Sequence, residues 1–241
     1  MSQSKQTLAI TLFIEQVKVS AGGRNGLLAG LISQKHQVRF LFPATNYLGG
    51  NMPANFLVSD THFGHAGVCR FLRDDGTKLR PWDNPEEMDE EMVKRWNETV
   101  RPNDKVYHLG DVVINRKALK TLARLNGDKV LIKGNHDIFR LDEYTPYFRD
   151  IRGYHVMNGM ILSHIPMHSE SLARFGTNIH GHLHYNRVKS EIFGEYEIDP
   201  RYHCVCVEHT DYRPILFEDV IKRIKEEGGT VGFRNGNGPV M

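Results

Sequence analysis

Apolar runs that end in polar residues alternate with amphipathic segments along the chain from Asn55 onward. Such runs are "NFLVSD" (Asn55 to Asp60), "KVYHLGD" (Lys105 to Asp111) and "KVLIK" (Lys129 to Lys133). Near-continuous hydrophobic runs of this length are typical of strands buried in a parallel sheet. Segments with helical periodicity separate them, at Asn84 to Val100 and Arg116 to Asn126. The order therefore predicts a βαβαβ unit within an α/β fold.

Both predicted helices carry apolar residues on one face. The first has Met88, Met92, Val93 and Trp96 on that face, and the second has Leu119, Leu122 and Leu125. Asn84 is the expected N-cap of the first helix, and Pro85 suits its first turn. Gly127 follows the predicted end of the second helix.

The second half of the chain is predicted to add antiparallel character. Asn158-Gly159 lies between apolar runs in "YHVMNGMILSH" (Tyr154 to His164), which is a strong hairpin signal. Further strands are predicted at "TNIHGHLH" (Thr177 to His184) and "HCVCVEH" (His203 to His209). In the latter, Cys204 and Cys206 share one face and are interpreted as core thiols. A last helix is predicted, with an apolar face of Phe217, Val220, Ile221 and Ile224.

The predicted domain spans residues 52–228. Residues 1–51 carry no chemical motif and are interpreted as an N-terminal extension of uncertain order. Residues 229–241 are rich in Gly, Asn and Pro and are predicted to form a flexible C-terminal tail.

Composition narrows the classes of protein without naming a function. A chain of 241 residues with 40% hydrophobic and 25% charged residues is ordinary for a globular protein. Its net charge of +2 does not predict a stable complex with nucleic acid, and "TLAITLFI" (Thr7 to Ile14) is too short for a membrane span. Three cysteines do not make a disulfide scaffold, so we expect a cytoplasmic location, in the host cytoplasm if the chain is phage-encoded. The oligomeric state stays open.

Polar side chains follow nearly every predicted strand. They are Asp60, His62, Asp111, Asn135, His136, His164, His182 and His184. Any one of them would usually be a helix cap or a structural hydrogen bond. Because ligands of open α/β sheets bind beyond the carboxyl ends of the strands, the set as a whole predicts a metal site.

The donor types indicate which ions the site would take. Imidazole and carboxylate with one amide oxygen and no thiolate favour manganese, zinc or iron over copper or calcium. So many donors suit two divalent ions bridged by a shared carboxylate better than one ion, and such pairs act in phosphoryl transfer. We expect two Mn²⁺ ions, with Zn²⁺, Fe, Co²⁺ and Mg²⁺ as alternatives.

Five ordered blocks resemble those of the calcineurin-like metallophosphoesterases, in particular a bacterial and phage subgroup. They are "SDTHFGH" (Ser59 to His65), "GD" (Gly110, Asp111), "GNHD" (Gly134 to Asp137), "SH" (Ser163, His164) and "GHLH" (Gly181 to His184). The resemblance covers roughly Asn55 to Glu208. It implies a sandwich of two mixed β-sheets flanked by helices (αββα) and hydrolysis of phosphate esters by metal-activated water.

The resemblance also implies a role for each matching residue. Asp60, His62, Asp111 and His184 would hold one ion, and Asp111 would bridge to a second ion held by Asn135, His164 and His182. His136 would donate a proton to the leaving oxygen or stabilise the transition state, with Asp137 as a supporting partner in the catalytic set. His65 is a further catalytic candidate, either touching the substrate phosphate or making a structural hydrogen bond.

The chain also departs from one branch of the family. Protein Ser/Thr phosphatases carry a longer block, GDxxDRG, whereas Ile114 stands here where the second Asp would be. The acidic residue that would orient the catalytic histidine is therefore missing, which argues against a protein phosphatase. For the remaining histidines we expect structural roles: His108, His155, His168, His180, His203 and His209.

The polar loop "CRFLRDDGTKLRPWD" (Cys69 to Asp83) bears on the substrate. Its Arg70, Arg73, Lys78 and Arg80 could contact phosphate and its Phe71 and Trp82 a base, although both aromatic residues could instead lie in the core. The favoured substrate is a small phosphoester, a (deoxy)nucleoside 5′-monophosphate. The alternatives are a phosphodiesterase acting on cyclic nucleotides or nucleic acid, and a non-catalytic scaffold of the same fold.

Overall fold

Two mixed β-sheets form the framework of the protein in the computed structural model, which describes residues 52–192 and 195–233. The first sheet has the order β11-β1-β2-β3-β4. Its strands are β1 (Asn55–Val58), β2 (Lys105–His108), β3 (Asp128–Ile132), β4 (Asp150–Arg152) and β11 (Ile215–Leu216). The first four run parallel, and β11 pairs antiparallel with β1. The predicted parallel unit is confirmed.

The second sheet has the order β10-β7-β6-β5. Its strands are β5 (Tyr154–Met157), β6 (Met160–Ser163), β7 (Asn178–His180) and β10 (Tyr202–Cys204). β6, β7 and β10 run parallel, and β5 is antiparallel to β6. A separate hairpin joins β8 (Lys189–Ile192) and β9 (Glu195–Ile198). The carboxyl ends of β6 and β7 lead directly to His164 and His182.

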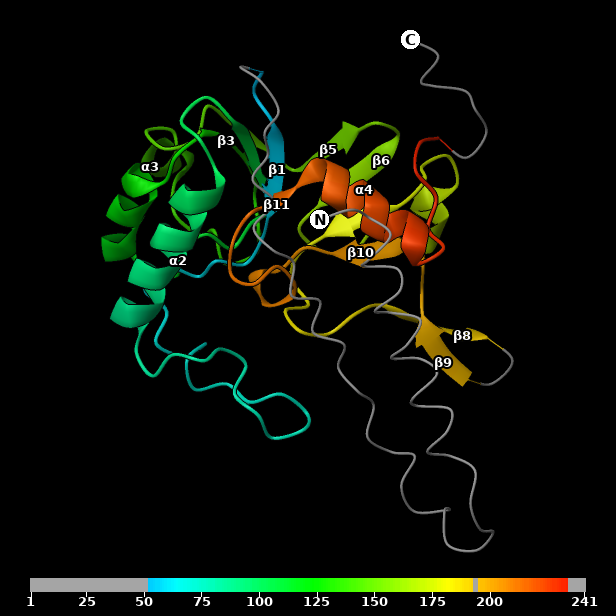
Figure 1. Cartoon of the computed structure of the whole chain (residues 1–241), viewed down its shortest axis with the longest axis horizontal. Coiled ribbons are helices and arrows are strands. Elements are labelled where there is room, and N and C mark those ends of the chain that lie inside the picture. Colours follow the sequence, from blue (N-terminus) through cyan, green and yellow to red (C-terminus); the bar gives the residue numbers. More distant parts are fainter. Residues whose placement is uncertain (1–51, 193–194, 234–241) are drawn as a thin grey trace, which may run out of the picture. The chain divides into compact units, whose positions relative to one another are not determined.

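The helices flank this framework (Figure 1). The α-helices are α2 (Pro85–Thr99), α3 (Leu141–Tyr144) and α4 (Phe217–Glu226). Three 3₁₀ helices are η1 (Arg116–Arg124), η2 (Ser169–Leu172) and η3 (Val207–His209). Both sheets are mixed and carry helices, so the predicted fold class is confirmed.

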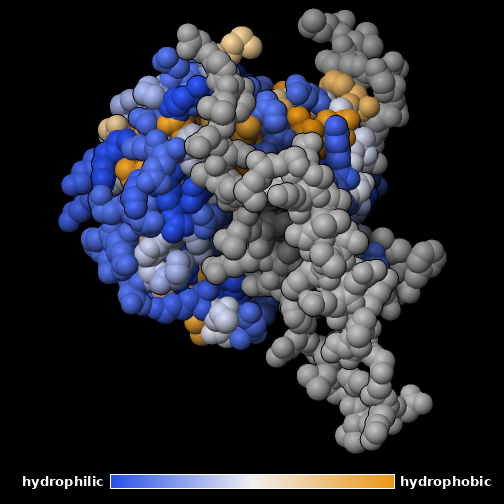
Figure 2. Space-filling model, viewed as in Figure 1, coloured by the Kyte–Doolittle hydropathy of each residue, from blue (hydrophilic) through white to orange (hydrophobic). Residues whose placement is uncertain are grey.

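Helix α2 covers one face of the first sheet, as its sequence predicts. The side chain of Asn84 accepts a hydrogen bond from the backbone N–H of Glu87 and caps the helix. Its predicted apolar face is buried against β1 and β2: Met88, Met92, Val93 and Trp96 pack with Phe56, Val58 and Val106. The outward face is charged, and Figure 2 shows a largely hydrophilic surface on this side of the molecule.

The core between the two sheets is apolar. Leu57 and Val130 of the first sheet pack in one cluster with Leu162 and Ile179 of the second, and Val220 of α4 joins them. The other face of the second sheet packs against η2, a single short turn, through Ile161, Leu172 and Tyr202. The strands that lead to the polar motifs are therefore held by burial on both faces.

Several local predictions need correction. The segment from Arg116 is a 3₁₀ helix and not an α-helix, and its leucines at every third position suit three residues per turn. The strands end earlier than predicted: β1 at Val58, β2 at His108, β7 at His180 and β10 at Cys204. The chain beyond these points cannot stay extended because several residues that follow have left-handed backbone angles.

The predicted hairpin is confirmed. β5 and β6 pair antiparallel, with Met157 opposite Met160. Asn158 and Gly159 have φ values of 48° and 72°, as a type I′ turn requires.

The predictions for the two ends of the chain concern residues 1–51 and 229–241. Residues 1–51 and 234–241 lie outside the described residues. Within the predicted tail, the hydroxyl of Thr177 donates to the backbone oxygen of Thr230, and Phe233 pairs with Phe175. In the described part of the chain, no helix is long and apolar enough to cross a membrane.

Candidate metal centre

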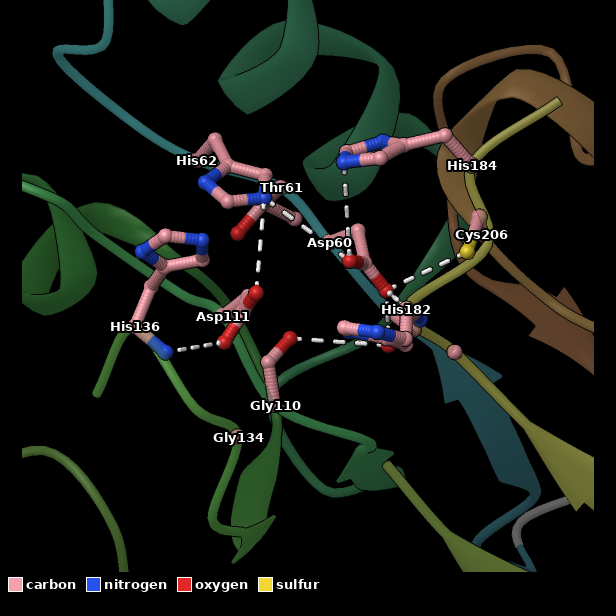
Figure 3. A network of polar contacts seen from close by, with 12 residues as sticks. Asp60, Thr61, His62, Gly110, Asp111, Gly134, His136, His182, His184 and Cys206 are labelled. Atoms are coloured by element: carbon pink, nitrogen blue, oxygen red, sulfur yellow. Dashed lines mark hydrogen bonds and ion pairs between the residues drawn. The ribbon is translucent and has the colours of Figure 1, made fainter. Parts of the chain in front are cut away.

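The strand ends of both sheets bring the predicted ligands together (Figure 3). Asp60 and His62 follow β1, Asp111 follows β2, and Asn135 and His136 follow β3. His164 follows β6, and His182 and His184 follow β7. Two groups of potential ligand atoms result, one from Asp60, His62 and His184 and one from Asp111, His164 and His182. We refer to them as the first triad and the second triad.

In the first triad, one carboxylate oxygen faces two imidazole nitrogens. Oδ1 of Asp60 lies 3.7 Å from Nε2 of His62 and 3.9 Å from Nε2 of His184. The rings of His62 and His184 stack with centroids 5.1 Å apart. The other oxygen of Asp60 is fixed by the hydroxyl of Ser59 at 2.6 Å and the backbone N–H of His182 at 2.8 Å. Oδ1 is therefore the atom left to bind an ion.

In the second triad, Asn135 is a fourth member. Oδ2 of Asp111 lies 3.4 Å from Nε2 of His164. Oδ1 of Asn135 lies 2.8 Å from Nε2 of His164 and 2.9 Å from Nδ1 of His182. Nδ1 of His164 is 2.8 Å from the backbone oxygen of Leu109, which can only accept, so Nδ1 carries a proton and Nε2 is the nitrogen available to an ion.

Asp111 lies between the two triads. Its Oδ2 is 3.6 Å from Nε2 of His62 as well as 3.4 Å from Nε2 of His164. Two ligands bound to one ion at about 2.1 Å each cannot lie more than about 4.2 Å apart. All of these nitrogen–oxygen separations fall below that limit, and most exceed hydrogen-bonding distance. The geometry fits a carboxylate shared by two ions.

Unsatisfied buried atoms support the same fit. Oδ1 of Asp60 and both ring nitrogens of His62 are buried and have no hydrogen-bond partner among the described residues. Asp60 is fully buried and His62 is 2% exposed. Buried polar groups without partners cost roughly 1–3 kcal/mol each, so a cluster of them calls for a ligand.

Backbone strain is concentrated at the same residues. Asp60, His62, Asp111, His182 and His184 all have φ between 50° and 68°. Non-glycine residues rarely adopt this conformation, which costs of order 1–3 kcal/mol, and such strain gathers at functional sites. The left-handed bends turn these side chains toward the centre.

Motif glycines allow the loops to approach one another. A Cβ on Gly181 would lie 2.5 Å from Oδ2 of Asp60 and closer still to the hydroxyl of Ser59. A Cβ on Gly134 would overlap Oδ1 of Asp111. Each glycine therefore leaves room for one of the two carboxylates.

Asp137 holds the loops that carry Asp111 and Asn135. Its carboxylate is fully buried and accepts the backbone N–H groups of Gly134, Asp111 and Val112 at 2.8–2.9 Å. Burial raises the pKa of Asp137, although these donors oppose the shift. A carboxylate so enclosed fixes the loops after β2 and β3, a position that suits the supporting role that the resemblance implies for Asp137.

His136 and His65 both lie beside His62. Each ring centroid is 5.5 Å from that of His62, and the His136 side chain is exposed. The backbone N–H of His136 donates to Oδ1 of Asp111, while no carboxylate among the described residues bonds to its ring. Burial, with His62 and Arg80 nearby, lowers the pKa of His65 to about 4, so this ring is neutral at pH 7. Both imidazoles can contact a group bound over the triads.

Glu208 and Arg80 were missed as parts of the site. Oε1 of Glu208 lies 3.1 Å from Nδ1 of His184 and accepts from Nε of Arg80 at 2.9 Å. Arg80 is fully buried and also donates to the backbone oxygens of Asp60 and Thr61. Burial raises the pKa of Glu208, but Arg80 and His184 outweigh it and lower the pKa to about 2. The prediction that Arg80 contacts phosphate from the loop is wrong.

The rest of that loop divides between core and surface. Trp82 is buried against Tyr212, as one alternative predicted. Phe71 is 49% exposed. Its ring is edge-on to that of His65, and the two ring centroids are 5.9 Å apart. The guanidinium of Arg73 lies over the ring of Tyr185, which directly follows His184. The loop therefore borders the first triad.

Other polar residues near the site are structural. His108 is buried, accepts from the N–H of Gly110 and bonds to the hydroxyl of Thr61. Burial lowers its pKa to about 3, so it stays neutral. Cys204 and Cys206 are free, buried thiols, as predicted for core residues. The sulfur of Cys206 also lies 3.2 Å from Oδ2 of Asp60, a contact that strand periodicity does not reveal.

Comparisons with known proteins find similarity over most of the chain. The uncharacterized protein MJ1445 of Methanocaldococcus jannaschii is 36% identical over 181 residues, which are 71% of this chain and 91% of that protein. The crystal structure of the protein of unknown function AQ665 from Aquifex aeolicus is similar at a TM-score of 0.51 and 25% identity, over 71% of this chain and all of that chain.

A third similarity is more distant. A novel archaeal phosphodiesterase has a TM-score of 0.34 and 20% identity, over 61% of this chain and 82% of its own, which is too low to support an argument about substrate. The family model for calcineurin-like phosphoesterases matches residues 56–223, more than half of the chain and a range that includes both triads. The chain therefore belongs to the calcineurin-like phosphoesterase family.

Proposed function

We propose that this protein hydrolyses phosphate monoesters with two divalent metal ions, and that its substrates are (deoxy)nucleoside 5′-monophosphates. One observation carries the metal part of the proposal: Oδ2 of Asp111 lies within 3.6 Å of a histidine nitrogen in each triad. When bound, two such ions neutralise phosphoryl charge and make water a nucleophile at neutral pH.

The side chains divide the remaining work. Asp60, His62 and His184 would hold one ion, Asn135, His164 and His182 the other, and Asp111 both. His136 is exposed beside His62 and is suited to give a proton to the leaving oxygen. Its general acid contribution would be about 10²–10⁴-fold. His65, neutral and also beside His62, would orient the phosphate as a hydrogen-bond donor.

Aromatic groups beside the first triad support a nucleotide substrate. Phe71 is exposed next to His65, and Tyr185 lies under Arg73 next to His184. A base could stack on an aromatic side chain here, and each such stack contributes about 1–3 kcal/mol. Arg70 is exposed in the same loop and could contact the substrate phosphate, whereas Arg80 is buried.

Manganese remains the proposed ion because imidazole, carboxylate and amide ligands suit it, with zinc, iron, cobalt and magnesium to be compared directly. A cytoplasmic location is part of the same proposal, in keeping with the three free thiols. A small phosphoester is the expected partner.

The test is phosphate release by purified, Mn²⁺-loaded protein across mono-, di- and cyclic nucleotides, with mono-aryl and bis-aryl phosphates in parallel. We expect release from nucleoside 5′-monophosphates and faster cleavage of the mono-aryl ester. Faster cleavage of the bis-aryl ester would replace the proposal with a phosphodiesterase. No hydrolysis of any ester with manganese or zinc would favour a non-catalytic scaffold.

A pair of variants tests the nucleotide part separately. Phe71→Ala removes the exposed ring beside His65, and Leu72→Ala removes its exposed neighbour, for which no contact with the site is seen among the described residues. Phe71→Ala should raise KM for nucleotides about 5–150-fold, in line with a stacking contribution of about 1–3 kcal/mol. KM for a small alkyl phosphate should not change. Equal effects of the two variants would contradict the stacking role.

A further inference from the structure

The imidazoles of the two triads differ in the group that contacts the ring nitrogen opposite the one that would bind an ion; that group is said here to lie behind the histidine. Behind His164 is a neutral backbone oxygen, that of Leu109. Behind His184 is the carboxylate of Glu208, 3.1 Å from Nδ1. A carboxylate there fixes the tautomer with the proton on Nδ1 and makes Nε2 a stronger ligand.

The charge of Glu208 is itself balanced within the core. Glu208 and Arg80 side chains have no solvent exposure, and Nε of Arg80 donates to the same oxygen that faces His184. A buried carboxylate without a counter-ion would be costly, so Arg80 is what allows Glu208 to remain charged behind the histidine.

Arg80 reaches the first triad by a second route. Its Nη2 donates to the backbone oxygen of Asp60 at 2.5 Å and its Nη1 to that of Thr61 at 2.7 Å. These carbonyls belong to the stretch in which Asp60 and His62 adopt left-handed angles. One guanidinium therefore fixes the backbone of two members of the first triad and, through Glu208, the ring of the third.

We propose that Arg80 and Glu208 are positioning residues that strengthen ion binding at the first triad and leave the second triad unaffected. This inference rests on the proposed metal centre. It predicts two inequivalent ion sites, since no charged pair of this kind supports the second triad among the described residues.

The experiment measures Mn²⁺ binding by calorimetry on the full chain in two backgrounds. His164→Ala disables the second triad, and His184→Ala disables the first. In the His164→Ala background, Glu208→Gln should weaken Mn²⁺ binding about 10-fold and the double change Arg80→Met with Glu208→Leu up to about 100-fold. In the His184→Ala background, neither change should alter the affinity.

A matched control exists elsewhere in the chain. Arg187, Glu227 and His203 form another arginine–glutamate–histidine group, and none of the three belongs to either triad. Glu227→Gln should leave Mn²⁺ affinity unchanged in either background. The double change at Arg80 and Glu208 removes both buried charges together, so it guards against a variant that fails only because one charge is left unpaired.

A second readout is independent of the metal. In the metal-free protein, nitrogen NMR should find the His184 proton on Nδ1, retained in Glu208→Gln, which keeps an acceptor oxygen, and shifted toward Nε2 in the double variant. Unchanged Mn²⁺ affinity in the folded Glu208→Gln and double variants, or equal weakening in both backgrounds, would overturn the inference. Wild-type protein that binds no Mn²⁺ would overturn the proposed centre and the inference together.

Discussion

The two triads meet at Asp111 but are built differently. The second triad is largely satisfied by its own members, because Asn135 bonds to both His164 and His182. In the first triad, Asp60 Oδ1 and the His62 ring nitrogens have no hydrogen-bond partner among the described residues. The first triad is also the one supported by buried charges, Arg80 and Glu208.

This difference shows how one fold can build two candidate ion sites in distinct ways. The first triad is strained in its backbone, with Asp60, His62 and His184 all left-handed, and lacks internal hydrogen bonds to offset that strain. We infer that it depends on an ion for its order. The second triad can keep its arrangement through Asn135 and the backbone oxygen of Leu109.

The largest expected effect comes from the residue that the triads share. Asp111→Asn keeps the size of the side chain but removes the charge that would bridge the ions. Both ions should bind more weakly, and turnover should fall by more than the 10²–10⁴-fold expected for loss of a general acid. Metal analysis together with phosphate release checks this, and retention of two tightly bound ions would contradict the shared role of Asp111.

Loss of the exposed imidazole should affect chemistry alone. His136→Ala should lower kcat by about 10²–10⁴-fold while the protein keeps its ions, because this ring belongs to neither triad. The same metal analysis serves as the control. Metal loss equal to that in Asp111→Asn would mean that His136 is a ligand.

Alanine substitutions at two glycines should affect the two triads differently, because each added methyl group would overlap a different carboxylate. Gly181→Ala places a methyl group against Asp60, and Gly134→Ala places one against Asp111. Overpacking of this kind costs about 1–3 kcal/mol. Gly181→Ala should weaken one ion and Gly134→Ala both, as measured by metal titration and thermal unfolding. The reverse pattern would contradict the assignment of carboxylates to ions.

The smallest effect concerns pH and the loop that carries His62. Asp89 accepts the backbone N–H of Gly64, and burial raises the pKa of Asp89 from its ordinary 3.8 to about 6. Between pH 4 and 6 the folded protein therefore holds a proton that the unfolded chain has lost, so this group's stabilising contribution falls as pH rises through that window.

Asp89→Asn should remove this dependence while keeping an acceptor for Gly64. Relative to the wild type, the variant should gain stability from pH 4 to pH 6 in urea unfolding. Glu98→Gln, an exposed change on the same helix, provides the control. A stability difference between Asp89→Asn and wild type that does not vary with pH would show that Asp89 has an ordinary pKa.

The sequence indicated the candidate ligands, but it did not indicate Arg80 and Glu208, which contact them. Each ligand block follows a buried strand, so Asp60, Asp111 and His164 could be placed by adjacency to β1, β2 and β6. Local chemistry also predicted the turn at Asn158-Gly159 and the cap at Asn84.

Long-range pairs could not be found in this way. Glu208 and Arg80 are 128 residues apart, and neither stands in a motif, so only the folded chain reveals their contact. Arg80 also lies in a polar loop, where arginine is usually exposed, and its burial depends on accepting groups from the loop after β1 and from η3. The left-handed bends at His182 and His184 likewise overrode the strand periodicity of "TNIHGHLH".

The most direct measurement is anomalous scattering from crystals grown with Mn²⁺. Two peaks about 3.5–4 Å apart are predicted, one bonded to Asp60, His62 and His184 and one to Asn135, His164 and His182, with Asp111 between them. A single peak, or two peaks of which only one touches Asp111, would contradict a centre built on a shared carboxylate.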